Sequence, residues 1–169
     1  MAKPLSIIKY PDPILRRKAK PVVRFNSDLN HLIDEMLVTM RRAEGVGLAA
    51  PQIGKSIQLI VIEYTPAPDE ADTIKPIPTT ILINPKIVQS SEALSLIEEG
   101  CLSVPGQDIN ILRPDSVKIE NTRPNGEKYI FSADGLLARI CQHEMDHLIG
   151  KLIVDYPNIS SSKENSAIL

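Results

Sequence analysis

The stretch "DGLLARICQHEMDHLIG", Asp134 to Gly150, decides the fold, because its apolar residues follow helical spacing while its polar residues form a metal-site pattern. Asp134 is a candidate helix cap and Gly150 a helix stop. On such a helix His143 and His147 lie one turn apart on one face, so both imidazoles can reach one metal ion. Glu144 projects about 100° around the axis from His143, where it can take a proton from a water that the metal activates. This arrangement suits hydrolysis.

Composition limits the classes of protein that the chain can represent. Its 169 residues are 43% hydrophobic and carry a net charge of -2, so we expect one compact domain with no general attraction for nucleic acid or anionic membranes. No apolar run approaches the roughly 18 residues of a membrane span, and no signal peptide is visible. We expect a cytoplasmic protein with no membrane contact and no sequence-specific nucleic-acid binding. A catalytic domain over 1–155 and a polar, disordered tail over 156–169 are predicted.

An amphipathic helix is predicted from Leu29 to Glu44-Gly45, with Ser27 or Asp28 as its cap. His31 lies off its apolar stripe and should face solvent. The glycine-rich segment after this helix interrupts both helix and strand patterns and would let the backbone approach a ligand. The other expected elements are a buried strand over 56–64, a proline-rich acidic loop over 65–80, a strand over 81–85 and a β-hairpin over 116–135.

A catalytic divalent ion usually has a third protein ligand, which the helix does not supply. The extended protease pattern His-Glu-x-x-His-x-x-Gly-x-x-His fails here, because its last position is Ile153. Asp155 is conceivable but has no supporting pattern. Cys141 points about 200° away from the first motif histidine and should be a core residue. Cys101, in the turn "EEGCLSVPG", is the better candidate, although its spacing in the sequence leaves the choice open.

Three segments together resemble the signature motifs of the peptide deformylase family. They are "GVGLAAPQIG" (45–54), "EGCLSVPG" (99–106) and "QHEMDHLIG" (142–150), in the same order and at similar spacing. The segments "YPDPILRRKA" and "ADGLLARI" are also similar to that family, so the resemblance covers roughly residues 5 to 155. It implies an α+β fold in which β-sheets surround a central helix that carries the metal motif.

The same resemblance implies an activity and a metal. The activity is removal of the formyl group from the N-terminal formyl-methionine of newly made proteins, which releases formate. The implied ligands are Cys101, His143 and His147, with Glu144 as general base and acid. Ferrous iron is the implied metal in the cell, and zinc, nickel or cobalt suit the same ligands. The implied partners are formylmethionyl peptides and nascent chains, with transient ribosome contact.

The resemblance also assigns residues around the substrate. The side-chain amide of Gln52 and the backbone N–H of Leu102 are the implied donors to the developing oxyanion. Val46-Gly47-Leu48 offers a backbone edge for a peptide. The methionine side chain is expected near Val46, Ile140 and His143, and the remaining implied substrate contacts are Glu99 and Gly100.

Several alternatives stay open in the sequence. An endopeptidase with the same helix motif would be indifferent to Cys101, and a structural or metal-sensing module would have four protein ligands and no open position. Glu99 orients a group in the cleft, supports Cys101 from behind, or is solvated beside Glu98. Asp146 is expected to support the helix or its histidines. The native metal, the oligomeric state and the preference beyond methionine are not determined by the sequence.

Overall fold

The computed structural model describes residues 2–69, 73–157 and 159. Within these residues, two helices and seven strands make up an α+β fold, which confirms the expected class. In chain order the helices and strands are α1 (Ser27–Arg42), β1 (Gly47–Ala49), β2 (Leu59–Tyr64), β3 (Ile77–Ser90), β4 (Leu94–Cys101), β5 (Val104–Pro114), β6 (Ser116–Thr122), β7 (Lys128–Asp134) and α2 (Gly135–Leu148). Short 3₁₀ turns are Pro13–Arg16, Ala50–Ile53 and Ile153–Asp155.

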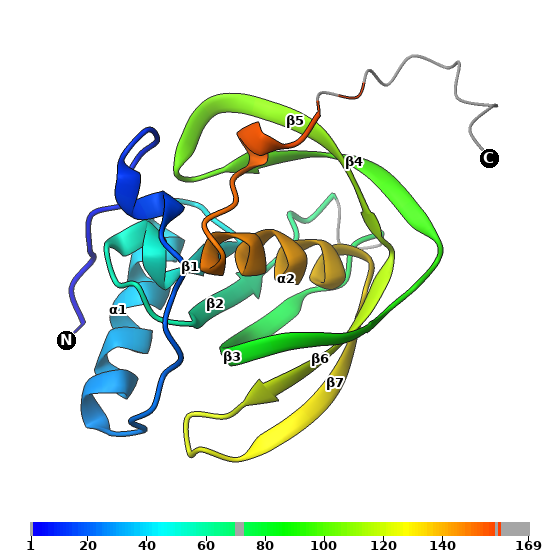
Figure 1. Cartoon of the computed structure of the whole chain (residues 1–169). Coiled ribbons are helices and arrows are strands. Elements are labelled where there is room, and N and C mark those ends of the chain that lie inside the picture. The colour runs from blue at the N-terminus through cyan, green and yellow to red at the C-terminus, as the bar shows by residue number, and fades with distance from the viewer. Residues whose placement is uncertain (1, 70–72, 158, 160–169) are drawn as a thin grey trace.

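Helix α2 lies between two antiparallel sheets (Figure 1). One sheet has five strands in the order β1-β2-β3-β6-β7, and the other is the hairpin of β4 and β5. Strand β1 is therefore an edge strand, with one side paired to β2. The last residue of β4 is Cys101, so the small sheet brings this thiol toward the helix. The sheets thus surround the helix that carries the metal motif, as predicted.

The predicted hairpin over 116–135 is confirmed, because β6 and β7 pair from Ser116 with Asp134 to Thr122 with Lys128. The strand expected over 81–85 is much longer, since β3 begins at Ile77 inside the predicted loop and runs to Ser90. It carries irregular pairing with β6. The buried amide of Asn121 bridges this irregularity, accepting from the Ile83 N–H at 2.7 Å and donating to the Ile81 carbonyl and the Tyr129 hydroxyl, each at 2.9 Å.

Helix α1 follows the predicted apolar stripe, whose members pack into a core with β1 and β2. Its cap is Asn26, which accepts a hydrogen bond from the Leu29 N–H at 3.2 Å, and not Ser27 or Asp28. The helix begins two residues earlier than predicted because Asn26 has the extended backbone and the side-chain oxygen that an N-cap needs. His31 faces solvent, as expected.

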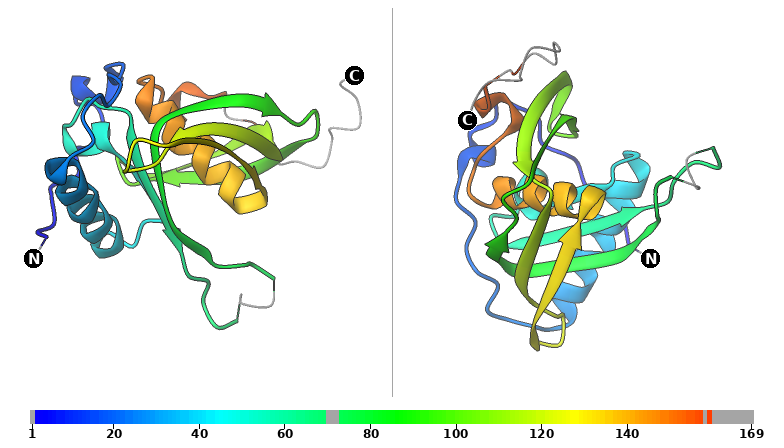
Figure 2. Two further views of the ribbon diagram at one scale, coloured as in Figure 1. Left: turned by 90° about the horizontal axis from the view of Figure 1, so that it is seen from below. Right: turned by 90° about the vertical axis from the view of Figure 1, so that its right-hand side faces the viewer.

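Two regions of the predictions fall partly outside the described residues. Positions 70–72 of the acidic loop are not described, and the segments on either side of them extend away from the body of the molecule (Figure 2). Of the predicted tail, 158 and 160–169 lie outside the described residues. Its first residue, Tyr156, packs against the β4–β5 hairpin. In the described part of the chain, no helix is both long and apolar enough to cross a bilayer.

Candidate metal centre and active site

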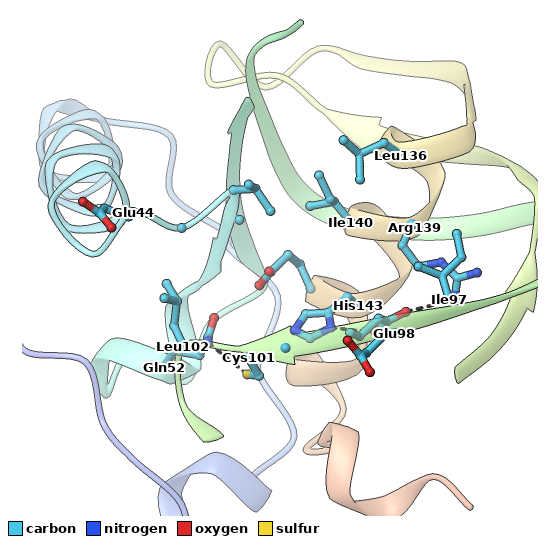
Figure 3. Close-up of a pocket in the computed structure, with 16 residues that line it drawn as sticks. Glu44, Gln52, Ile97, Glu98, Cys101, Leu102, Leu136, Arg139, Ile140 and His143 are labelled. Atoms are coloured by element: carbon cyan, nitrogen blue, oxygen red, sulfur yellow. Dashed lines mark hydrogen bonds and ion pairs between the residues drawn. The ribbon is translucent and has the colours of Figure 1, made fainter. Parts of the chain in front are cut away.

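Cys101, His143 and His147 meet at one point in the fold. Each offers a ligand atom, and the three atoms lie within 4.8 Å of one another. The Cys101 Sγ is 3.3 Å from the His147 Nε2. The histidines come from α2 and the cysteine from the end of β4, so the cluster joins two elements that are distant in the sequence. Figure 3 shows Cys101 next to the Gln52 side chain, with His143 extending toward it from the helix.

The two histidines of the cluster differ in their electrostatics. Burial lowers the pKa of His147 to about 3, which keeps this imidazole neutral and free to donate a lone pair. Burial also acts to lower the pKa of His143, but the Cys101 thiol and the Glu99 carboxylate outweigh it and raise this pKa to about 10. One sulfur and two imidazole donors that converge at one point fit a divalent transition metal. The residues present therefore suit the ion that such a site would hold.

Glu99 supports the cluster from behind and is not solvated. It is 6% exposed, and its Oε2 lies 2.8 Å from the His143 Nδ1. Arg113 donates to both Glu99 oxygens at 2.7 and 3.0 Å, and Arg139 donates to Oε1 at 3.0 Å. Burial alone would raise the pKa of Glu99, but hydrogen bonds with His143 and Arg113 hold it at about 2. Glu99 thus stays ionised and fixes the orientation of the His143 ring, and its contact is with this ligand and not with Cys101.

Glu144 is buried beside the three ligand atoms. Its side chain is 4% exposed, and in the described structure its Oε2 has no hydrogen-bond partner. Burial raises the pKa of Glu144 to about 7. Strand β1 passes so close that a Cβ on Gly47 would lie 2.5 Å from Glu144 Oε1. The glycine expected to allow close backbone approach therefore faces this carboxylate.

Gln52 approaches the cluster from the 3₁₀ turn after β1. Its Oε1 accepts the Ala49 N–H at 2.8 Å, which turns the amide nitrogen toward the β4–β5 turn. There Nε2 donates to Ser103 Oγ at 3.2 Å and lies 3.8 Å from Cys101 Sγ (Figure 3). A donor beside the ligand atoms can stabilise an oxygen that becomes negative during reaction.

A cavity of about 420 Å³ opens onto this cluster. It contains most of the sequence-predicted site residues, but Leu48 is fully buried in the core behind β1 and does not line it. His147, which is 2% exposed, is not among the lining residues either. The predicted residues that do line it are Val46, Gly47, Gln52, Glu99, Gly100, Cys101, Leu102, Ile140, His143 and Glu144. The additional lining residues include Glu44, Ile97, Leu136 and Arg139.

Comparison with known proteins identifies the family. Residues 4–165 match the family model described as polypeptide deformylase. The chain belongs to the peptide deformylase family. Peptide deformylases are metal-dependent hydrolases, and the Cys101, His143 and His147 cluster is a possible metal-binding site in this member.

Individual peptide deformylases match over nearly the whole chain. The enzyme of Rhizobium meliloti (strain 1021) is 42% identical over 166 residues, covering 98% of this chain and 90% of that protein. The chloroplastic peptide deformylase 1B of Oryza sativa subsp. japonica is 43% identical over 152 residues, 90% of this chain. The chain spans 54% of that plant relative's length. A crystal structure of class I type b peptide deformylase from Acinetobacter baumannii with Met-Ala-Ser bound has a TM-score of 0.86 and 36% identity, covering 94% of this chain and 100% of that one.

Sequence reasoning missed the polar residues that hold this peptide deformylase site from behind. Arg113 and Arg139 are both buried, and their partners are distant in sequence. Asp146, expected to support the helix, accepts from Arg113 at 2.8 Å and from Tyr156 at 2.6 Å. Local patterns carry no signal for such pairs, because an arginine in a strand or a helix looks like an exposed residue until its buried partner is known.

The weaker ligand candidates lie elsewhere. Asp155 is paired with Arg16 and is outside the cluster. Ile153, which occupies the position of a protease's third histidine, is buried in the small core formed with β5. Cys141 is a fully buried core residue, as predicted, and burial raises its pKa to about 12.

Proposed function

We propose that this chain is a metal-dependent hydrolase that removes the formyl group from the N-terminal formyl-methionine of newly synthesised proteins and releases formate. One observation carries the proposal. Three ligand atoms, from Cys101, His143 and His147, converge within 4.8 Å in a member of the peptide deformylase family. The Met-Ala-Ser bound to the Acinetobacter baumannii relative is what remains of such a substrate after its formyl group is removed.

We infer that Cys101, His143 and His147 hold the metal. Three protein ligands leave a position open, which is the arrangement of a catalytic site and not of a closed structural one. A bound divalent ion would supply Lewis acidity, polarising the formyl carbonyl and making water a better nucleophile. Ferrous iron is the metal we propose for the cell, and zinc, nickel or cobalt would suit the same donors.

Glu144 moves the proton in this proposal. It accepts a proton from the attacking water and returns it to the amine nitrogen when the bond between that nitrogen and the formyl carbon breaks. Its buried position and a pKa of about 7 support both transfers near neutral pH. The absence of a partner for Oε2 in the described structure leaves that oxygen available to the water.

Gln52 and Leu102 are proposed to stabilise the negative charge that develops on the formyl oxygen. The Ala49 N–H holds the Gln52 amide with its nitrogen toward the cluster, so the donor is oriented before the substrate arrives. The backbone N–H of Leu102 follows Cys101 directly in the chain. Loss of one such donor typically reduces kcat by about a hundred- to a thousandfold.

We propose that the substrate's backbone pairs with the free edge of β1 at Val46, Gly47 and Leu48, with Leu48 contributing backbone only. The methionine side chain would enter the cavity near Val46, Ile140 and His143. The other proposed substrate contacts are Glu99 and Gly100. Nascent chains in the cytoplasm are the proposed substrates, met through transient contact with the ribosome.

Formate release from formyl-Met-Ala-Ser tests the proposal. Iron-loaded protein, prepared without oxygen, is compared with its metal-free form, with Glu144→Gln and with Glu92→Gln, which removes an exposed carboxylate elsewhere. Glu144→Gln should lower kcat by about 10² to 10⁴ while keeping the metal, since only proton transfer is removed. Glu92→Gln should match the unaltered protein. Cleavage of an unformylated internal peptide bond without formate release would overturn the proposal in favour of an endopeptidase.

The cysteine separates the remaining alternatives. Cys101→Ser should lower metal affinity and deformylation together if the thiolate is a ligand. A variant with full metal content and full activity would remove Cys101 from the site. Spectroscopy of the cobalt-loaded protein that finds no exchangeable water would instead favour a closed structural or sensing centre.

A further inference from the structure

The proposed metal ligands come from two separate elements, so something must hold those elements in register. Cys101 ends β4, whereas both histidines lie on α2. Among the described residues, the β4–β5 hairpin is assigned as a separate sheet, joined at its base to the β3–β6 pair by the Ser91–Ser116 and Ala93–Asp115 backbone hydrogen bonds. At the far end of the hairpin, where Cys101 lies, side chains that connect the hairpin to the helix help to set the distance between the thiol and the imidazoles.

Arg113 of β5 is the centre of that connection. Its Nε and Nη2 donate to Glu99 on β4, and its Nη1 donates to Asp146 on α2 at 2.8 Å. Glu99 in turn contacts His143, and Asp146 immediately precedes His147. The arginine side chain is 5% exposed, so its guanidinium is largely shielded from water, whereas the Asp146 side chain is 18% exposed. Arg113 thus links the strand that carries the cysteine to the helix that carries both histidines, alongside Arg139 of α2, which donates to Glu99 on β4 and to the Ile111 carbonyl on β5.

Tyr156 closes this network from a third segment. After α2 the chain turns through Ile153–Asp155 and packs on β5, which brings the Tyr156 ring beneath Arg113 with the guanidinium carbon 5.0 Å from the ring centroid. The Tyr156 hydroxyl donates to Asp146 Oδ2 at 2.6 Å and accepts from Arg113 Nη1 at 3.0 Å. The hydroxyl therefore touches both ends of the bond between β5 and α2.

We propose that Tyr156 is a positioning residue for the metal centre, whose hydroxyl holds Arg113 and Asp146 together and so sets the separation of Cys101 from His143 and His147. This inference rests on the metal site proposed above. Without the hydroxyl, Asp146 Oδ2 keeps one donor in place of two, and Arg113 Nη1 loses an acceptor. The guanidinium is then less constrained, which loosens one of the two arginine contacts that hold the Glu99 carboxylate against His143, while the contact from Arg139 remains.

Tyr156→Phe isolates the hydroxyl, because the ring keeps its packing and its contacts with Arg113 and with the Lys151 ammonium. Tyr129→Phe is the matched control. Tyr129 also has a hydrogen-bonded hydroxyl and an arginine, Arg123, over its ring, but it belongs to β7 and contacts none of the network residues named above. Comparing the two variants separates loss of any tyrosine hydroxyl from loss of this one.

Cobalt binding to the full-length chain gives a readout besides activity. For Tyr156→Phe we expect the Co²⁺ dissociation constant to rise roughly three- to tenfold, less than the tenfold or more typical when a direct partner of a ligand is lost. The thiolate-to-cobalt absorption band should shift, and kcat for formyl-Met-Ala-Ser should fall with KM unchanged. Tyr129→Phe should leave the affinity, spectrum and kcat as they are.

A double-mutant cycle with Asp146→Asn tests whether the hydroxyl acts through Asp146. Effects of the two changes on Co²⁺ affinity should be strongly non-additive. An unchanged dissociation constant and spectrum in Tyr156→Phe, additive effects in the cycle, or equal losses in Tyr129→Phe would each overturn the inference. If the unaltered chain takes up no Co²⁺ at Cys101, the proposed metal site fails as well, so the two failures are distinguishable.

Discussion

Replacing Gly47 by alanine should displace the carboxylate of Glu144, the proposed general base, while Glu144 itself is left unmutated. The new Cβ would lie 2.5 Å from Glu144 Oε1 and 2.9 Å from its Cγ and Cδ, whereas an ordinary contact begins at 3.4 Å. Strand β1 cannot retreat easily, because Gly47 is paired with Ile62 and its neighbours are buried. The carboxylate must therefore move by roughly 1 Å, a displacement that can cost about a hundredfold in rate.

The assay is kcat for formate release, measured together with metal content and thermal unfolding. We expect kcat to fall about a hundredfold and stability to fall by about 1 to 3 kcal/mol from overpacking, with the metal retained. Gly126→Ala is the control. Gly126 lies in a hairpin turn far from the site with φ +88, a backbone conformation that alanine adopts only with strain, and its new Cβ would meet only Phe25 at 3.9 Å. The variant protein should therefore lose stability and keep the kcat of the unaltered protein. Full kcat in Gly47→Ala would refute the reasoning, because Glu144 would then tolerate displacement.

Three further predictions concern stability. Gly150→Ala should lower the free energy of unfolding by at least about 2 kcal/mol, because φ is +77 and the new Cβ would lie 2.3 Å from the Arg16 carbonyl oxygen. An unchanged midpoint of denaturant unfolding would contradict this. Asn121→Ala should lower the free energy of unfolding by about 2 to 3 kcal/mol, because the Ile83 N–H and the Ile81 carbonyl of β3 lose their partner. A loss below about 0.5 kcal/mol, the level of an ordinary surface substitution, would show that Asn121 does not stabilise β3 in this way. Hydrogen bonds from Arg41 lower the pKa of Glu63 from 4.5 to about 2, so its stabilisation is complete above pH 4.5 and disappears as pH falls toward 2. Glu63→Gln should therefore be less stable than the unaltered protein at pH 7, by under about 1 kcal/mol because the Arg41–Glu63 pair is partly exposed. This difference in unfolding free energy should disappear by pH 2, and a difference that stays constant with pH would refute a lowered pKa for Glu63.

Local periodicity determined much of the architecture. Helix α2, its motif histidines and the β6–β7 hairpin were predictable, because helical spacing and a Pro-Asn-Gly turn are properties of neighbouring residues. The β4–β5 hairpin was not predicted as strands. Its apolar residues Leu94, Ile97 and Leu112 are about half exposed, so the hairpin lacks the clear division into buried and solvated faces that marks a strand.

The sequence by itself placed two histidines and a glutamate on one helix and left the third ligand among alternatives. Only the tertiary structure brought Cys101 to within 3.3 Å of His147, since that distance depends on how a separate hairpin docks on the helix. Only the tertiary structure likewise brought Arg113 and Tyr156 together behind the metal cluster. Burying a charge is tolerated only when its partners are buried with it, and the partners Glu99 and Tyr156 lie 14 and 43 residues from Arg113 along the chain.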